Sequence, residues 1–309
     1  MANGNANLHR AKREKNDEFF TQYSDIEKEL VHYKDFFNGK TVYCNCDTIA
    51  SNFMKFFDDK FDEYGLKKLI VTGLKSKGGI IYQRTKNSVY VGDLKGDGRF
   101  QSEECIEFLK ECDVVVTNPP FSLFREYVAL LMQYNKKFLI IGNMNATTNK
   151  DFFPYIKDNK IWLGQNAKGG TRKGNSMVFV SDNGEEKDIS SWWYTNIDCQ
   201  RHNTPLDLYK HYNPEEYPKY DNYDAIEVGR SCEIPMDYDG VMGVPISFLM
   251  FHCPTQFEII WQASGNTRAC APKDVLKQLA YRQHREDRGG CGVVNGKRCY
   301  SRIFIKKLA

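Results

Sequence analysis

The chain has 309 residues, of which 41% are hydrophobic, 27% charged and 14% aromatic, and its formal net charge is +3. Such a composition excludes a disordered or collagen-like chain, and the length suggests about two domains. No apolar run approaches the ~18 residues that a membrane span needs, and the first residues lack the apolar core of a secretory signal, so we expect a cytoplasmic protein with no membrane partner.

The ten cysteines and six histidines show no metal-binding pattern. The closest cysteine pair, Cys44 and Cys46, is separated by one residue, and no CxxC pair occurs. Zinc sites need Cys or His ligands at characteristic short spacings. We therefore expect no metal, and we interpret the thiols as reduced and mostly buried.

Short apolar runs alternate with amphipathic stretches over the first part of the chain. The pattern predicts helices at residues 103–111 and 122–132, the latter with Ser122 as N-cap, and strands at 41–46, 68–72, 113–117, 137–142 and 160–163. Continuously apolar strands are typical of a parallel sheet that is buried on both faces. The predicted fold is therefore α/β, with a doubly wound, Rossmann-like sheet.

The sequence changes character near residue 200. Residues 200–244 are rich in Tyr, Pro, Asn and Asp, and residues 266–309 are basic. We predict an α/β domain over residues 1–199 and a smaller, irregular domain over 200–309. The basic segment carries a net charge of +8, whereas the rest of the chain carries −5. Clustered cations of this kind suit a polyanion, although a solvated basic tail would look the same.

Two basic segments are candidates for phosphate binding. Arg282, Arg285 and Arg288 recur every three residues, a spacing that would place them along one side of a helix. Arg172 and Lys173 lie in a glycine-rich stretch, residues 167–175, which we interpret as a phosphate clamp, a lid or an ordinary solvated loop.

The segment 113–124, DVVVTNPPFSLF, carries the clearest chemical signal. A predicted buried strand leads directly into Asn118, Pro119, Pro120 and Phe121, and a helix follows. Ligands of open α/β sheets bind at the carboxyl ends of strands, where this tetrapeptide would lie. The prolines stiffen the turn, Asn118 offers a hydrogen-bond acceptor and a donor, and Phe121 offers a flat apolar face. This combination suits an amino group on a flat heteroaromatic ring.

Residues 118–121 resemble the (Asp/Asn/Ser)-Pro-Pro-(Tyr/Phe) signature of amino-group methyltransferases that use S-adenosyl-L-methionine. The exocyclic amine of adenine is a weak nucleophile because its lone pair is delocalised into the ring. The Asn118 side chain and the Pro119 carbonyl would accept its hydrogens and localise that lone pair, while Phe121 stacks on the ring. We assign Asn118 to the cofactor site as well. A rigid turn with a hydrophobic Phe is the alternative interpretation.

Three further segments fit the cofactor site of such enzymes. Phe20 and Thr21, in DEFFTQY, resemble the motif beside the methionine end of the cofactor, with Thr21 as partner of its carboxylate. Asn45 and Asp47 follow the first strand, where such enzymes usually carry a glycine-rich turn, and we place them at the methionyl ammonium or the ribose. Asp97, between two glycines, is the candidate acceptor for the adenine amino group of the cofactor. Polar strand ends and an ordinary Asp-Gly turn would explain the same residues.

Together with KKFLIIGN, KIWLG, YPKYDNYDAI and GVMGVPISFL, these segments resemble the EcoRI-type adenine-specific DNA methylases over nearly the whole chain. The resemblance implies a monomeric enzyme that methylates N6 of adenine in double-stranded DNA, in a restriction–modification or phage setting. It also makes a GAATTC-like site the leading expectation for the target, and it assigns target recognition to the second domain.

Adenine N6 is inaccessible inside a duplex, so such an enzyme has to flip the base out. Phe121 is the first candidate to stack on the flipped base. The second candidates are Trp192, Trp193 and Tyr194, for which a place in the hydrophobic core is the alternative.

Two other functions remain open at this point. A methyltransferase acting on glutamine N5 of a protein would use the same Asn-Pro-Pro site, because it also binds a carboxamide nitrogen. A sequence-specific DNA-binding protein that has lost catalysis would explain the missing glycines in the cofactor turn. The basic second domain argues against the first alternative, and the intact residues 118–121 argue against the second.

Overall fold

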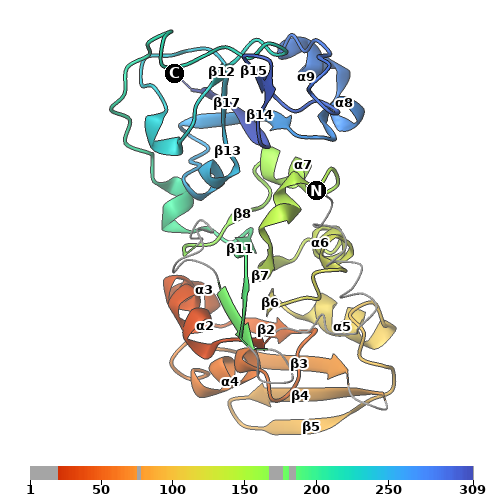
Figure 1. Cartoon of the computed structure of the whole chain (residues 1–309). Helices are drawn as coiled ribbons and strands as arrows, with labels where there is room; N and C mark the ends of the chain where they lie inside the picture. Colours follow the sequence, from red (N-terminus) through yellow and green to blue (C-terminus); the bar gives the residue numbers. More distant parts are fainter. Residues whose placement is uncertain (1–19, 75–77, 167–176, 181–185, 309) are drawn as a thin grey trace. The chain divides into compact units, whose positions relative to one another are not determined.

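The computed structural model describes residues 20–74, 78–166, 177–180 and 186–308 (Figure 1). The chain divides into two units. The first comprises Met1–Met144 and Gly164–Cys199, and the second comprises Asn145–Leu163 and Gln200–Ala309. Within the described ranges, none of the helices has the length and apolar character that a bilayer span requires.

A sheet with a parallel centre forms the core of the first unit. Its central strands lie in the order β3-β2-β6-β7, with the bounds Lys68–Leu74, Thr41–Cys44, Val114–Thr117 and Lys137–Asn143. Each of these strands pairs in parallel with its neighbour. All residues of β2 and β6 are buried, as expected for strands covered on both faces. The prediction of buried parallel strands is confirmed for these four runs.

Three strands that flank this centre, β4, β5 and β11, pair in the antiparallel sense, so the sheet is mixed rather than uniformly parallel. The hairpin of β4 (Gly79–Thr85) and β5 (Val89–Leu94) continues the sheet beyond β3, and β11 (Ser191–Thr195) pairs with β7. A second, antiparallel sheet consists of β1 (Phe20–Thr21), β9 (Met177–Val180) and β10 (Glu186–Ile189).

Five helices of the first unit are α2 (Tyr23–Leu30), α3 (Lys34–Phe37), α4 (Asn52–Asp59), α5 (Glu103–Glu111) and α6 (Phe124–Gln133). The side chains of Ser51 and Ser102 cap α4 and α5 by accepting hydrogen bonds from backbone N–H groups of the first turn. The prediction of Ser122 as N-cap is wrong, because α6 starts only after Leu123. Leu123 N donates to the Pro120 carbonyl (2.9 Å), and this turn delays the helix.

The aromatic residues of β11 belong to the core of the first unit. Trp192, Trp193 and Tyr194 are all buried, and Trp193 meets Phe53 of α4 edge to face, with 6.0 Å between ring centroids. Their interpretation as core residues is confirmed, and a role in stacking on a flipped base is excluded by their burial.

A four-stranded sheet organises the second unit. The strands lie in the order β12-β13-β17-β14, with the bounds Ile226–Glu227, Met242–Pro245, Arg302–Lys307 and Phe257–Ala263. The β12–β13 pair is parallel and the other two pairs are antiparallel. The sequence predicts an irregular domain here, so the unit is more regular than expected.

The other elements of the second unit are short. They include the strand β8 (Trp162–Leu163), the helices α7 (Phe153–Lys157), α8 (Thr267–Cys270) and α9 (Lys273–Gln278), and the hairpin of β15 (Val293–Val294) and β16 (Lys297–Arg298). Three 3-10 helices cover Gln200–Asn203, Ser231–Glu233 and Ile246–Met250.

The prediction that Arg282, Arg285 and Arg288 lie on a helix is wrong. Helix α9 ends at Gln278, and the three arginines lie outside helices and strands, with their side chains exposed. Arg288 has a φ of +42°, which a right-handed helix does not accommodate. The spacing does not produce a helix because the Asp287 carboxylate accepts hydrogen bonds from the backbone N–H groups of His284 and Gly289, in place of helical hydrogen bonds.

Gly73, near the end of β3, has no room for a side chain, because a Cβ there would collide with the backbone carbonyl of Asp47. We expect Gly73→Ala to lower the free energy of unfolding by about 1–3 kcal/mol, the usual cost of overpacking a closed site. Gly96→Ala is the matched control, since its Cβ would meet nothing nearer than Ser102 at 3.8 Å. Urea denaturation compares the two variants, and equal midpoints would contradict the close contact at Gly73.

Candidate active site

A pocket of about 440 Å³ opens at the carboxyl ends of β2, β3 and β6. Open α/β sheets bind ligands at this edge, and the volume suits a small organic molecule. Four residues that the sequence singles out line it, namely Thr21, Asp47, Asn118 and Pro120. The structure therefore brings the N-terminal motif, the turn after the first predicted strand and the Asn-Pro-Pro segment to one pocket.

The turn after β2 has no glycine, yet its backbone takes a conformation typical of glycine. Cys46 has a φ of +60°, which costs a non-glycine residue about 1–2 kcal/mol. Gly73 packs against this turn, and Gly98 in turn packs against Gly73. A Cβ at Gly73 would strike the Asp47 carbonyl, and a Cβ at Gly98 would come within 2.5 Å of the Gly73 carbonyl oxygen. The close approach that a glycine-rich turn normally provides thus comes from neighbouring strands and loops.

Thr117, the last residue of β6, connects this turn to the Asn-Pro-Pro segment. Its hydroxyl donates to Asp47 Oδ2 (2.7 Å) and also contacts the Asn45 carbonyl oxygen. The buried Asn45 side chain accepts from the Tyr127 hydroxyl of α6. Burial raises the pKa of Tyr127 well above its ordinary value, so this hydroxyl keeps the proton that it donates. Asn45 thus holds the turn from within the core, whereas Asp47 faces the pocket.

The four residues of the Asn-Pro-Pro-Phe segment have different surroundings. Asn118 and Pro120 are half-buried and line the pocket, whereas Pro119 is buried. Phe121 is half-buried and meets Phe179 of β9 edge to face, with 6.2 Å between ring centroids. Phe121 does not line the pocket, so its role in stacking on a base stays a prediction.

Thr21 in β1 carries a hydroxyl whose environment points to a ligand. Its side chain lines the pocket, the residue is 4% exposed, and Oγ1 has no hydrogen-bond partner among the described residues. The Thr21 carbonyl accepts from Asn52 Nδ2 (2.8 Å), which joins β1 to the start of α4. Buried polar groups are nearly always satisfied, so this hydroxyl is a candidate partner for a molecule bound in the pocket. Phe20 precedes Thr21 in β1, and its side chain lies outside the described part of the structure.

Asp97 lies beside the pocket lining rather than in it. Its exposed carboxylate accepts from the backbone N–H of Arg99 (3.0 Å) and pairs with the Arg99 side chain (3.2 Å). The next residues, Gly98, Arg99 and Phe100, do line the pocket. Phe100 is buried and packs edge to face on Tyr127, with 5.0 Å between ring centroids. The role of Asp97 at the cofactor adenine stays a prediction.

Sequence reasoning missed several residues of the pocket. Ser51 and Asn52 line it at the start of α4, and Leu74 lines it at the end of β3. The serine before the run NFMKFF is a recognisable N-cap signal, which could have placed a helix N-terminus here. Leu74 carries no signal of this kind, because its place follows from strand pairing alone.

The chain has close relatives among known proteins. A family model described as adenine-specific methyltransferase EcoRI matches residues 7–91 and 79–308. The type II methyltransferase M.EcoRI of Escherichia coli is 46% identical over 97% of this chain and 95% of its own length. M.MgeORF184P of Mycoplasma genitalium and M.MpnI of Mycoplasma pneumoniae, also type II methyltransferases, are 39% and 38% identical, each over 97% of this chain and 98% of their own length. The chain belongs to the EcoRI family of adenine-specific methyltransferases. No solved structure matches it.

The family predicted from the motifs is thereby confirmed. The protein is a site-specific DNA methyltransferase that acts on adenine. The family match extends across both units of the chain. The roles of the individual site residues remain predictions.

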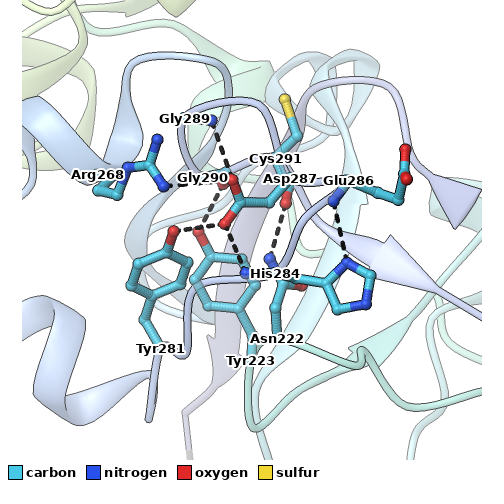
Figure 2. Close-up of polar contacts among 10 residues, drawn as sticks. All are labelled: Asn222, Tyr223, Arg268, Tyr281, His284, Glu286, Asp287, Gly289, Gly290 and Cys291. Atoms are coloured by element: carbon cyan, nitrogen blue, oxygen red, sulfur yellow. Dashed lines mark hydrogen bonds and ion pairs between the residues drawn. The ribbon is translucent and has the colours of Figure 1, made fainter. Parts of the chain in front are cut away.

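Residues 282–292 of the second unit form a loop that carries several arginines, which we call the basic loop. Its backbone is organised around the Asp287 side chain (Figure 2). The carboxylate is 1% exposed and accepts from Tyr281 Oη (2.5 Å), His284 N (3.1 Å) and Gly289 N (3.0 Å). The guanidinium of Arg268 lies 3.7 Å away. Burial alone would raise the pKa of Asp287, but the hydrogen bonds and the Arg268 charge outweigh burial and hold it below its ordinary value.

The candidate phosphate-binding arginines lie on this loop. Arg282, Arg285 and Arg288 are exposed, and Arg285 Nε is 3.6 Å from the Glu286 carboxylate. Arg172 and Lys173 lie outside the described residues.

The lowered pKa of Asp287 predicts a pH-dependent contribution to stability. The contribution is complete above the unfolded-state pKa of about 4 and is lost as the pH falls through the lower folded-state pKa. We therefore expect Asp287→Asn to cost about 1–3 kcal/mol of unfolding free energy at pH 7 and less below pH 4. Thermal unfolding at several pH values measures the gap between wild type and variant. The exposed Asp274→Asn is the control, and a gap that stays constant with pH would contradict the role of the carboxylate.

Proposed function

We propose that this methyltransferase transfers the methyl group of S-adenosyl-L-methionine to N6 of a flipped-out adenine in double-stranded DNA. In this proposal the first unit is a Rossmann-like catalytic domain and the second unit recognises the target. One observation carries it: Asn118 and Pro120 line the same pocket as Thr21 and Asp47. The residues suited to an aromatic amine and those suited to the cofactor thus share one cavity.

The polar groups of the pocket suit the methionine part of this cofactor. The Thr21 hydroxyl needs a partner, and Ser51 and Asn52 place the N-terminus of α4 at the pocket, where the helix dipole favours a carboxylate. The Asp47 carboxylate suits an ammonium group or ribose hydroxyls, and Phe100 offers apolar contact for a flat base. The bound cofactor supplies an electrophilic methyl group on a positively charged sulfur.

Asn118 and Pro119 would activate the acceptor amine. The Asn118 side-chain oxygen and the Pro119 carbonyl accept the two amino hydrogens, which localises the nitrogen lone pair and stabilises its developing positive charge. The lone pair then forms the new N–C bond while the bond between methyl carbon and sulfur breaks, with its electron pair passing to sulfur. The surplus proton leaves the methylated nitrogen for water.

Access to the adenine requires unpairing, which costs a few kcal/mol. Stacking on an aromatic side chain offsets about 1–3 kcal/mol per base. Phe121 is the candidate, because it directly follows the two prolines and is only half-buried. We also propose a GAATTC-like recognition site and a restriction–modification or phage setting, supported by the 46% identity to M.EcoRI over nearly the full length.

Asn118→Ala should leave folding and DNA binding nearly unchanged, because only one half-buried polar side chain is truncated. Turnover should fall on the order of 10²–10³-fold, the effect of losing one preorganised group that stabilises developing charge. Plasmid DNA incubated with S-adenosyl-L-methionine, followed by mapping of N6-methyladenine by single-molecule sequencing, measures both activity and site. Asn87→Ala, at an exposed turn, is the control. A rate within threefold of wild type would exclude the role of Asn118.

The triple variant Arg282→Ala, Arg285→Ala, Arg288→Ala should weaken binding to a target duplex and a scrambled duplex alike. For each arginine that binds a phosphate in the wild type, its removal should reduce the slope of log K against log salt by roughly 0.9. Affinity for S-adenosyl-L-methionine should stay unchanged, because its pocket lies in the first unit. The control replaces the exposed Lys67, Lys86 and Lys95 of the first unit by alanine. If the salt slope of the arginine variant equals that of wild type, these side chains are only solvated.

A further inference from the structure

The tyrosine-rich segment 217–226 holds the glycine-rich end of the basic loop. Asp221 N donates to the Val293 carbonyl (2.8 Å), and the Tyr223 hydroxyl donates to the Gly290 carbonyl (2.5 Å). A Cβ at Gly292 would collide with the ring of Tyr220, so the backbone lies directly on that ring. Residues 220–223 of this segment therefore hold the backbone of residues 290–293 in place through hydrogen bonds and ring contacts.

Among these residues, Asn222 makes several of the hydrogen bonds that hold this backbone (Figure 2). Its side chain is buried, Nδ2 donates to the Cys291 carbonyl (2.9 Å), and Oδ1 accepts from Val293 N (2.9 Å). The Asn222 carbonyl accepts from Arg282 N (3.0 Å). Asn222 thus forms hydrogen bonds both to the start of the basic loop, at Arg282, and to β15, the first strand of the hairpin that follows the loop.

The hairpin β15–β16 has a rigid, two-residue turn. Val294 pairs with Lys297, and Asn295 and Gly296 between them have φ values of +51° and +70°, as a type I′ turn requires. The Asp221 carboxylate accepts from Gly296 N (2.7 Å) and so holds the tip. Isolated two-stranded hairpins are marginally stable, and these side-chain contacts compensate for the short strands.

The hairpin displays side chains that contribute little to the core. Lys297 and Arg298 are exposed. Tyr300, two residues after β16, is 89% exposed, whereas the next most exposed large apolar or aromatic side chain of the described residues, Tyr209, is 62% exposed. Cys299 N donates to the Gly292 carbonyl (2.8 Å), so the backbone before Tyr300 is held in place. A fixed backbone that presents two cations and an aromatic ring to solvent is suited to a binding surface rather than to packing.

We propose that the hairpin β15–β16 together with Tyr300 is a duplex-contacting ribbon, in which Lys297 and Arg298 bind phosphates and Tyr300 packs on a base or deoxyribose. The proposal rests on the proposed function and names a contact surface for its DNA substrate. The major groove of B-DNA admits a two-stranded β-ribbon. Because Asn222 and Asp221 hold the ribbon in place beforehand, little conformational freedom is lost when DNA binds.

The ribbon predicts two separable effects on DNA binding. Tyr300→Ala should weaken binding to duplex DNA roughly 5- to 150-fold, the size of one aromatic stacking contact, and should leave the salt slope unchanged because the net charge stays the same. Tyr300→Phe should stay within twofold of wild type, since the ring is kept. The double variant Lys297→Ala, Arg298→Ala should reduce the salt slope by roughly 0.9 for each phosphate contact. Fluorescence anisotropy with a labelled target duplex at several salt concentrations measures all three.

Tyr209→Ala controls for loss of an exposed tyrosine in the same unit, and Lys67→Ala, Lys86→Ala controls for loss of two exposed cations. Wild-type methylation of plasmid DNA is measured in parallel. If wild type neither binds nor methylates DNA, the proposed function fails, and the ribbon fails with it. If wild type does both, while Tyr300→Ala and the Lys297, Arg298 variant match their controls, the ribbon alone is overturned.

Discussion

The hydrogen bond from the Thr117 hydroxyl to Asp47 joins the turn after β2 to the Asn-Pro-Pro segment, and both line the pocket. Thr117 ends β6 and directly precedes Asn118, whereas Asp47 lies in the turn after β2, the neighbouring parallel strand. Parallel neighbours end at the same edge of a sheet, so one short side chain can bridge them. This bridge keeps the two segments, both of which line the pocket, in one fixed relation.

The same physical device recurs away from the pocket: a buried polar side chain satisfies backbone groups of a loop. Glu29 accepts from Gln165 N (2.6 Å) and Asn166 N (2.7 Å), and burial raises its pKa despite these bonds. Asp287 and Asn222 hold the basic loop of the second unit in the same way. A loop whose backbone groups are satisfied in this way loses less conformational freedom when it binds another molecule.

The strands that the sequence predicts well are those with continuous apolar runs. Residues 68–72 and 113–117 appear as β3 and β6, because a strand that is buried on both faces needs apolar side chains at consecutive positions. The predicted helix at residues 103–111 coincides with α5, since Ser102 provides its cap. The antiparallel flanks and the sheet of the second unit were not foreseeable, because strand direction depends on partners distant in sequence.

The sequence by itself determined the family of this methyltransferase, because the motifs that it shares with the family, among them residues 118–121, can be recognised as local patterns. Only the tertiary structure decided how those atoms are held. Gly73 and Gly98 provide the close approach that the turn around Cys46 lacks, and Asn45 contacts Tyr127 in the core rather than the pocket. Likewise, hydrogen bonds from backbone N–H groups to the Asp287 carboxylate hold Arg282–Arg288 in a loop, where the spacing of the arginines predicts a helix. Each of these outcomes depends on hydrogen bonds and steric contacts between segments far apart in the chain, which a local pattern does not encode.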